Sequence, residues 1–122
     1  MNAQASNPCV LIVEDEMCLA MMLEDILMDA GYDVRKAARL PAALQLVQNE
    51  PFDVAILDIN LAGKEVCPVA DALSHLGVPF LFTSGYGHNG VPAEYRQRPM
   101  LQKPYNVEYL QQTLSALLQA RA

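Results

Sequence analysis

The chain has 122 residues, of which 52% are hydrophobic, and this length suits one globular domain with a sizeable core. Its 14 acidic and 8 basic residues give a formal charge of -6, which argues against a nucleic-acid surface because such surfaces need clustered lysine and arginine. No apolar stretch reaches the roughly 20 residues of a membrane helix, and the polar start MNAQASNP lacks a signal-peptide pattern. We therefore expect a cytoplasmic protein that binds neither nucleic acid nor membrane.

Five short segments predict β-strands. Residues 9–13 (CVLIV), 54–57 (VAIL) and 80–82 (FLF) are unbroken apolar runs, which are typical of strands buried on both faces of a sheet. Weaker strand patterns cover residues 33–36 and 100–102.

Segments with helical periodicity separate these strands. The second helix follows Pro41, the third ends at Gly77, and the last begins at Asn106, which we expect to act as its N-cap. The first helix ends at Gly31, and its predicted buried face comprises Leu19, Met22, Leu23, Ile26 and Ala30.

One stretch breaks this pattern. Residues 87–99 (GHNGVPAEYRQRP) contain two glycines, two prolines and little apolar periodicity, so we expect a loop with at most a short helical turn near residues 93–97. The fourth helix of the alternation is therefore predicted to be short or irregular.

Alternating strands and helices with short connections predict an α/β fold with a doubly wound parallel sheet and right-handed crossovers. Five strands suit the flavodoxin-like (βα)5 arrangement, in which the strand order is 2-1-3-4-5. The crevice at the carboxyl ends of strands 1 and 3 is the expected binding site of such a sheet.

Acidic residues follow both of those strands. Glu14 and Asp15 come directly after residues 9–13, and Asp58 comes directly after residues 54–57. Carboxylates that gather at one edge repel one another, and an oxygen-only ligand set favours Mg²⁺. We predict Asp15 and Asp58 as direct ligands, Glu14 as a ligand through water, and the backbone carbonyl of Asn60 as a further donor. The alternative is that the acids at residues 14–16 only cap the first helix.

The last two strands bring other groups to the same edge. Thr83 and Ser84 end the strand at residues 80–82, and Lys103 follows residues 100–102. A carboxylate nucleophile, Mg²⁺, a hydroxyl and a lysine together suggest phosphoryl transfer, because they share the charge of the transferred group.

With these motifs the sequence resembles the receiver domain of bacterial two-component response regulators, from about residue 9 to residue 120. The matching motifs are VEDE, LDIN, the small hydroxyl residue and KPY. The resemblance implies that Asp58 is the phosphoacceptor, that Glu14 and Asp15 form the acidic pocket, and that Lys103 is the family's invariant lysine. It also implies a cis peptide bond before Pro104.

The resemblance also selects the hydroxyl. In the family this residue lies five positions after the proline that opens the fourth strand, and counting from Pro79 gives Ser84. FTSGYG then resembles the FATGYG signature of the FATGUY receivers, which are often single-domain proteins, and Thr83 takes the alanine position.

One departure concerns the signalling switch. Many family members have an aromatic residue three positions before the lysine, where this chain has Met100. The resemblance therefore does not extend to the usual aromatic switch at this position, and Tyr86 and Tyr105 are the candidate replacements.

We expect a tail at residues 1–8, a receiver domain at residues 9–120 and no output domain. The leading hypothesis is a phosphoacceptor receiver that takes its phosphoryl group from a histidine kinase or phosphotransfer protein and signals to a downstream protein partner as a monomer or weak dimer. Only phosphotransfer to Asp58 and slow autodephosphorylation, tuned by Asn60 and Tyr86, are expected as catalysis.

Three alternatives stay open. The chain could be a phosphate-independent scaffold that keeps the receiver fold. It could be a phosphohydrolase of the haloacid dehalogenase type, although the DxD motif of those enzymes fails here, where Glu14 and Glu16 flank Asp15. It could also be a fragment of a longer hybrid kinase or regulator, although the initial methionine and the helical finish favour a complete protein.

Overall fold

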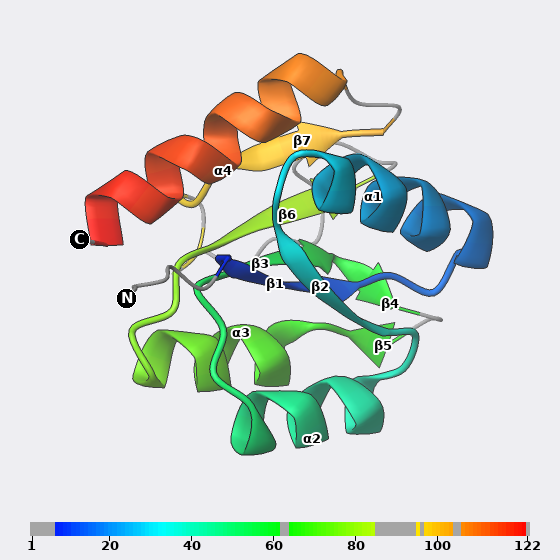
Figure 1. Ribbon diagram of the computed structural model, residues 1–122. Coiled ribbons are helices and arrows are strands. Elements are labelled where there is room, and N and C mark those ends of the chain that lie inside the picture. The colour runs from blue at the N-terminus through cyan, green and yellow to red at the C-terminus, as the bar shows by residue number, and fades with distance from the viewer. Residues whose placement is uncertain (1–6, 62–63, 85–94, 96, 104–105, 122) are drawn as a thin grey trace.

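The computed structural model describes residues 7–61, 64–84, 95, 97–103 and 106–121. Its centre is a five-stranded parallel sheet with the order β2-β1-β3-β6-β7 (Figure 1). This order confirms the predicted 2-1-3-4-5 arrangement. The strands are β1 (Cys9–Val13), β2 (Asp33–Ala37), β3 (Val54–Asp58), β6 (Phe80–Ser84) and β7 (Met100–Gln102).

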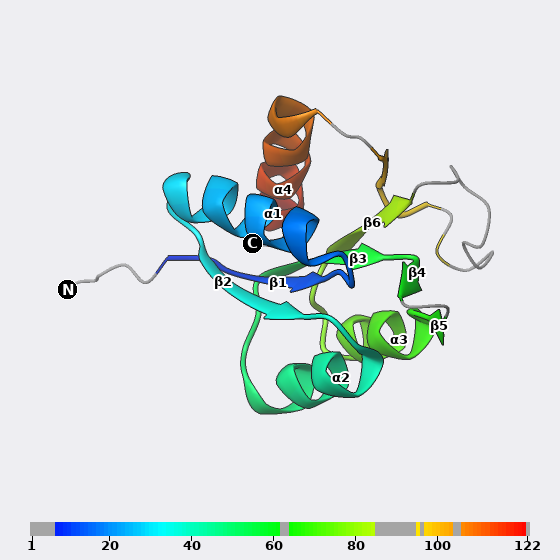
Figure 2. The ribbon, with the colours of Figure 1, turned by 90° about the vertical axis from the view of Figure 1, so that its right-hand side faces the viewer.

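Among the described residues, four helices cover the sheet. The helices α1 and α4 lie on one face and α2 and α3 on the other, so the sheet is the middle of three layers (Figures 1 and 2). The helices are α1 (Met17–Asp29), α2 (Leu40–Asn49), α3 (Cys67–His75) and α4 (Val107–Arg121). None of them is both long and apolar enough to cross a membrane.

The two faces of the sheet each carry a hydrophobic core. In β1, Leu11 and Val13 belong to the core beneath α2 and α3, whereas Val10 and Ile12 belong to the core beneath α1 and α4. All four side chains are fully buried because successive residues of a strand point to opposite faces. This explains why the strands appear in the sequence as unbroken apolar runs.

The predicted buried face of α1 is partly wrong. The buried residues are Ala20, Leu23 and Leu27, which follow the helical spacing i, i+3 and i+7. Met22 is 45% exposed, and Ala30 is exposed beyond the end of the helix. A run of apolar residues on both sides of Leu23 made the stripe ambiguous, because Met22 and Leu23 are adjacent and only one of them can face the sheet.

The helix boundaries follow the predicted signals. Gly31 and Gly77 have φ values of 99° and 74°, in the left-handed region that glycine adopts most easily after a helix. Asn106 Oδ1 accepts a hydrogen bond from the Tyr109 backbone N–H at 3.1 Å, which confirms Asn106 as the N-cap of α4.

Two features lie around these elements. A small antiparallel hairpin, β4 (Asn60–Leu61) and β5 (Lys64–Glu65), connects β3 to α3 and was not predicted. Most of the segment expected to be irregular lies outside the described residues. Tyr95 there has 3₁₀ geometry, and the Arg98 backbone N–H donates a hydrogen bond to the Tyr95 carbonyl oxygen at 3.0 Å.

Candidate functional site

The acidic residues come together because β1 and β3 are neighbours in the sheet. Val13 is in register with Leu57, so the residues that follow, Glu14 and Asp58, reach the same carboxyl edge. Glu14 N–H also donates to Ala37 O at 3.0 Å, which extends the pairing of β1 with β2 and holds the backbone of Glu14 at that edge.

Three carboxylates form the cluster. Glu14, Asp15 and Asp58 each offer one oxygen, and these oxygens all lie within 4.8 Å of one another. Glu14 and Asp58 are 3% and 6% exposed, whereas Asp15 is half-buried. Three acids this close repel one another, and a divalent cation relieves the repulsion. The donor set, all oxygen and partly open to water, suits Mg²⁺.

The structure also addresses the capping alternative. Glu16 is the N-cap of α1, but its side chain makes no capping hydrogen bond and no acid lies in the first turn. Instead, Glu14 Oε2 accepts a hydrogen bond from the Glu16 backbone N–H at 3.0 Å. Glu14 thus contributes to the start of the helix and is also a member of the acidic cluster.

Lys103 is the cation of this edge. Its Nζ lies 2.8 Å from Glu14 Oε1 and 3.4 Å from Asp58 Oδ2. Burial lowers the pKa of Lys103, but the hydrogen bond to Glu14 and the charge of Asp58 outweigh it and raise the pKa above its usual 10.5. The ammonium is therefore charged throughout the neutral range and stands beside the Asp58 carboxylate.

Two residues with hydroxyl groups, Thr83 and Ser84, end β6. This strand lies between β3, which ends at Asp58, and β7, which precedes Lys103. Thr83 is in register with Asp58, and both Thr83 and Ser84 are buried. The Lys103 backbone N–H donates a hydrogen bond to the Ser84 carbonyl oxygen at 2.8 Å. The backbone of the residue predicted to supply the hydroxyl is thus bonded directly to the backbone of the predicted lysine. The structure thus brings Glu14, Asp15, Asp58, Ser84 and Lys103 to one edge.

The other predicted residues are placed only in part. Asn60 begins β4 directly beyond the acidic edge. Met100 begins β7, where its half-buried side chain packs against the core beneath α2 and α3. Tyr86, Pro104 and Tyr105 lie outside the described residues, so the cis bond and the substitute aromatic switch stay predictions.

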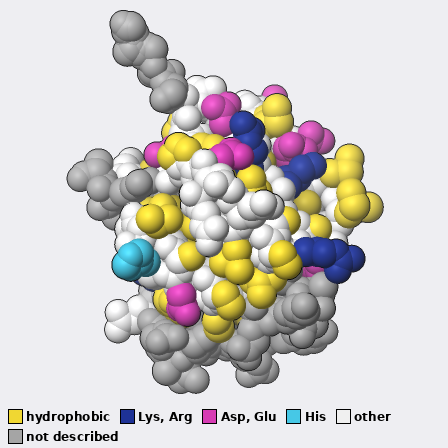
Figure 3. All heavy atoms as spheres, turned by 90° about the horizontal axis from the view of Figure 1, so that it is seen from below, with side chains coloured by type: hydrophobic (Ala, Val, Ile, Leu, Met, Phe, Trp, Pro, Cys, Tyr) yellow, Lys and Arg dark blue, Asp and Glu magenta, His cyan; other side chains and the backbone are white. Residues whose placement is uncertain are grey.

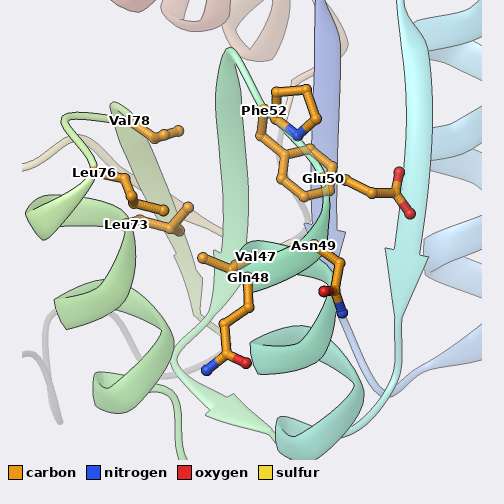
Figure 4. Close-up of a pocket in the computed structure, with 9 residues that line it drawn as sticks. Val47, Gln48, Asn49, Glu50, Phe52, Leu73, Leu76 and Val78 are labelled. Carbon is orange, nitrogen blue, oxygen red and sulfur yellow. The ribbon is translucent and has the colours of Figure 1, made fainter.

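A hollow lies away from these groups, at the other end of the strands. A depression of about 360 Å³ lies between the carboxyl ends of α2 and α3 and is lined by Val47, Phe52, Leu73 and Val78 (Figure 4). Phe52 and Val78 precede β3 and β6, so the depression is at the opposite edge of the sheet from Asp58. The underside of the molecule shows hydrophobic side chains among polar ones (Figure 3).

Comparisons with known proteins define the class. The sequence-family model of the response regulator receiver domain matches residues 10–115. The chain therefore belongs to the response regulator receiver family.

Particular relatives are similar over different shares of their length. The solution structure of SdrG from Sphingomonas melonis is 38% identical with a TM-score of 0.81, and the match covers 94% of this chain and 99% of that one. The receiver domain of PhyR from Erythrobacter litoralis is 30% identical, with a TM-score of 0.81, 97% coverage of this chain and 94% of that one.

Curated relatives match over a shorter part. The uncharacterized transcriptional regulatory protein YrkP of Bacillus subtilis is 39% identical in an alignment of 75 residues that covers 59% of this chain and 32% of that protein. The aerobic respiration control protein ArcA of Escherichia coli is 34% identical over 80 residues, which are 65% of this chain and 34% of that protein. The chain therefore spans about a third of the length of these relatives.

The family has a general role in signalling rather than in metabolic catalysis. Receiver domains are signalling domains that interact with histidine kinases or phosphotransfer proteins, and they generally bind Mg²⁺ at an acidic pocket. The family is distinct from the haloacid dehalogenases, whose DxD motif the chain also lacks.

Proposed function

We propose that this chain is a phosphoacceptor receiver in which Asp58 takes a phosphoryl group from a histidine kinase or a histidine phosphotransfer protein. One observation carries the proposal. Asp58 is a nearly buried carboxylate with two further acids within 4.8 Å and the ammonium of Lys103 at 3.4 Å. A carboxylate kept in such a place for stability alone would be costly, because the acids repel one another.

The chemistry follows from the groups at this edge. An oxygen of Asp58 forms the bond to phosphorus, the bond from phosphorus to the donor's imidazole nitrogen breaks, and the electron pair leaves with that nitrogen. Bound Mg²⁺ would neutralise charge on the phosphoryl oxygens, and Glu14, Asp15, Asp58 and the Asn60 carbonyl are the residues that would hold it.

Lys103 and Ser84 have complementary roles in this proposal. Lys103 already contacts Asp58, so its ammonium is positioned to pair with a phosphoryl oxygen once Asp58 is modified. Ser84 supplies the hydroxyl that hydrogen-bonds a second oxygen. Both groups stabilise charge that develops during transfer, which is the main contribution that a protein makes to this chemistry.

Mass measurement of the intact protein tests the proposal. Wild type incubated with acetyl phosphate and Mg²⁺ should gain one phosphoryl group. Asp58→Asn should gain none, and wild type with excess EDTA should gain none or far less. Asp25→Asn, which changes an exposed acid of α1, is the matched control and should behave as wild type. Equal phosphorylation of the Asp58→Asn variant would exclude Asp58 as the acceptor.

Met100 supports one second candidate, a phosphate-independent scaffold. Many family members have an aromatic residue three positions before the lysine, and this chain has Met100 there. The aromatic ring that usually links phosphorylation to a change at the surface is therefore missing at that position. Signalling in cells distinguishes the two candidates. An Asp58→Asn variant that retained full signalling would support the scaffold, whereas loss of signalling supports the phosphoacceptor.

In this proposal the domain passes on its signal by contact with another protein. We propose that residues 9–120 form the receiver, that the domain acts as a monomer or weak dimer, and that it binds or releases one downstream protein when Asp58 is modified. Autodephosphorylation would be slow, and Asn60 and Tyr86 are the flanking residues proposed to tune it.

A further inference from the structure

The strand that delivers Lys103 is held by few backbone contacts. β7 has only three residues and lies at the edge of the sheet. Its register with β6 pairs Phe82 with Met100 and Ser84 with Gln102. The sheet therefore restrains β7 from one side only, and the Leu101 side chain, 2% exposed, adds an anchor in the core beneath α1 and α4. The segment before β7 is a further place at which the position of Lys103, the residue directly after the strand, can be fixed.

Tyr95 and Arg98, which precede β7, make polar contacts that restrain the start of the strand. The Tyr95 hydroxyl donates a hydrogen bond to Asp71 Oδ1 on α3, and the Tyr95 side chain is buried. Three residues later, an Arg98 Nη lies 3.4 Å from the Ser74 hydroxyl, one turn along the same helix. Two consecutive polar contacts thus tie this segment to α3.

Aromatic contacts tie the same segment to β6. The Tyr95 ring lies edge-on to Phe80, with centroids 5.6 Å apart, and 6.0 Å from the Phe82 ring. The Arg98 guanidinium lies over the Phe80 ring, 4.4 Å from its centroid. Both geometries are favourable for aromatic and cation–π attraction. We call Tyr95, Arg98, Asp71 and Ser74 the α3 clamp.

The backbone carries this restraint to the site. Arg98 N–H closes the turn onto Tyr95 O, and Phe82 N–H donates to Pro99 O at 2.9 Å, one residue before β7 begins. At the other end of β7, Lys103 N–H donates to Ser84 O. The strand is therefore fixed at its start by the α3 clamp and at its end by the hydroxyl residue of the site.

We propose that Tyr95, held by its hydrogen bond to Asp71, is a positioning residue that sets the place of β7 and thereby of Lys103 beside Asp58. It is not one of the residues proposed to hold the phosphoryl group or Mg²⁺, and it acts through Lys103. The inference deepens the proposed function and rests on it where phosphorylation is the readout. Nothing in the motifs of the site requires a tyrosine at this position.

Three variants separate the hydrogen bond from the packing. Tyr95→Phe removes the hydroxyl and keeps the ring, Asp71→Ala removes the acceptor, and Asp71→Asn keeps an acceptor oxygen. The matched control is Tyr109→Phe, because Tyr109 is exposed on α4. The first readout is the initial rate of phosphorylation by acetyl phosphate at saturating Mg²⁺. The second is the set of backbone amide NMR signals of Ser84 and Lys103, which needs no phosphoryl transfer.

The expected result is a graded loss. Tyr95→Phe and Asp71→Ala should each lower the rate about fivefold, the size expected for one lost hydrogen bond. Asp71→Asn should retain more of the rate than Asp71→Ala, and the control should match wild type. The Ser84 and Lys103 amide signals should shift in both slow variants. The double variant should be no slower than either single variant, because both remove the same contact.

A second background tests whether Tyr95 acts through Lys103. In Lys103→Met, adding Tyr95→Phe should lower the rate no further, although its effect on unfolding free energy should persist. The inference would be overturned if Tyr95→Phe lowered the phosphorylation rate of Lys103→Met by the same factor as it lowers the rate of wild type. It would also be overturned if the Ser84 and Lys103 amide signals did not shift in Tyr95→Phe. If wild type takes up no phosphoryl group, the proposed function fails, and the amide signals alone then decide the role of Tyr95.

Discussion

Lys103 provides the internal counter-charge of the acidic edge. Its ammonium contacts both Glu14 and Asp58, and Glu14 also accepts the Glu16 backbone N–H. Both carboxylate oxygens of Glu14 thus have partners within the protein. This arrangement supports the prediction that Glu14 would reach Mg²⁺ through water, whereas Asp15 and Asp58 would bind it directly.

Asp15 is the residue at which charge repulsion can be tested most simply. It is half-buried, and removing its charge leaves the ion pairs of Lys103 in place. We predict that Asp15→Asn increases the free energy of unfolding without Mg²⁺ by about 1 kcal/mol, the size of the Coulomb interaction between two unit charges about 4 Å apart in bulk water. The variant should also bind Mg²⁺ more weakly. Urea unfolding with EDTA, and again with Mg²⁺, measures both effects.

The control for that experiment is Asp25→Asn on the exposed face of α1. It removes the same charge far from the carboxylate cluster and should change neither quantity appreciably. A less stable Asp15→Asn protein in EDTA would contradict the view that the acids repel one another in the metal-free state.

At the scale of elements, α1 offers a comparison between two adjacent residues. Leu23 is 1% exposed in the core beneath α1 and α4, and Met22 is 45% exposed. We predict that Leu23→Ala lowers the free energy of unfolding by about 2–5 kcal/mol because it leaves a cavity. Met22→Ala should change it by less than about 0.5 kcal/mol. Urea titration of both variants gives the comparison, and equal losses would contradict the assigned face of the helix.

The strands and most helix boundaries could be predicted because their signals are local. Unbroken apolar runs gave β1, β3 and β6, and Asn106 and Gly77 marked helix ends. The buried face of α1 could not be predicted reliably. Its apolar residues occur on several sides of the helix, so periodicity alone does not decide which of them meets the sheet. The β4–β5 hairpin has strands of only two residues, too short for any periodic signal.

The acidic edge was predictable for a different reason. In a parallel sheet, the residues that follow neighbouring strands must meet, so Glu14, Asp58 and Lys103 could be brought together from strand order alone. Distances could not be obtained in this way, and the pairing of Lys103 with Glu14 was not anticipated. The Tyr95–Asp71 contact was also missed, because Tyr95 lies in a segment without periodicity. The sequence signal that could have indicated this contact is the presence of Tyr95 and Arg98 in a segment with few apolar residues.

At the scale of the whole molecule, the site is built on the central strands that both cores share. Residues of β1 and β3 contribute to the packing on each face of the sheet, and the acids follow directly from those strands. Any ligand of the acidic cluster should therefore stabilise the entire fold, because binding to the native state alone shifts the unfolding equilibrium.

This coupling predicts a specific effect of Mg²⁺. At a Mg²⁺ concentration about 100 times its dissociation constant, the free energy of unfolding of wild type should rise by about 2.7 kcal/mol. Asp58→Asn should lose most of this gain, since a direct ligand has been removed. Thermal or urea unfolding with NaCl at matched ionic strength controls for screening. An equal gain for both proteins would show that Mg²⁺ stabilises the fold from elsewhere.

The most direct test of the central claim is to locate the phosphoryl group chemically. An aspartyl phosphate is an acyl phosphate, which borohydride reduces to homoserine, whereas an unmodified carboxylate does not react. We predict that protein treated with acetyl phosphate and Mg²⁺, then reduced and digested, carries homoserine at position 58 in the peptide that contains Val54–Asp58. Homoserine at another acid, or only aspartate at position 58 in protein shown to be phosphorylated, would contradict the account.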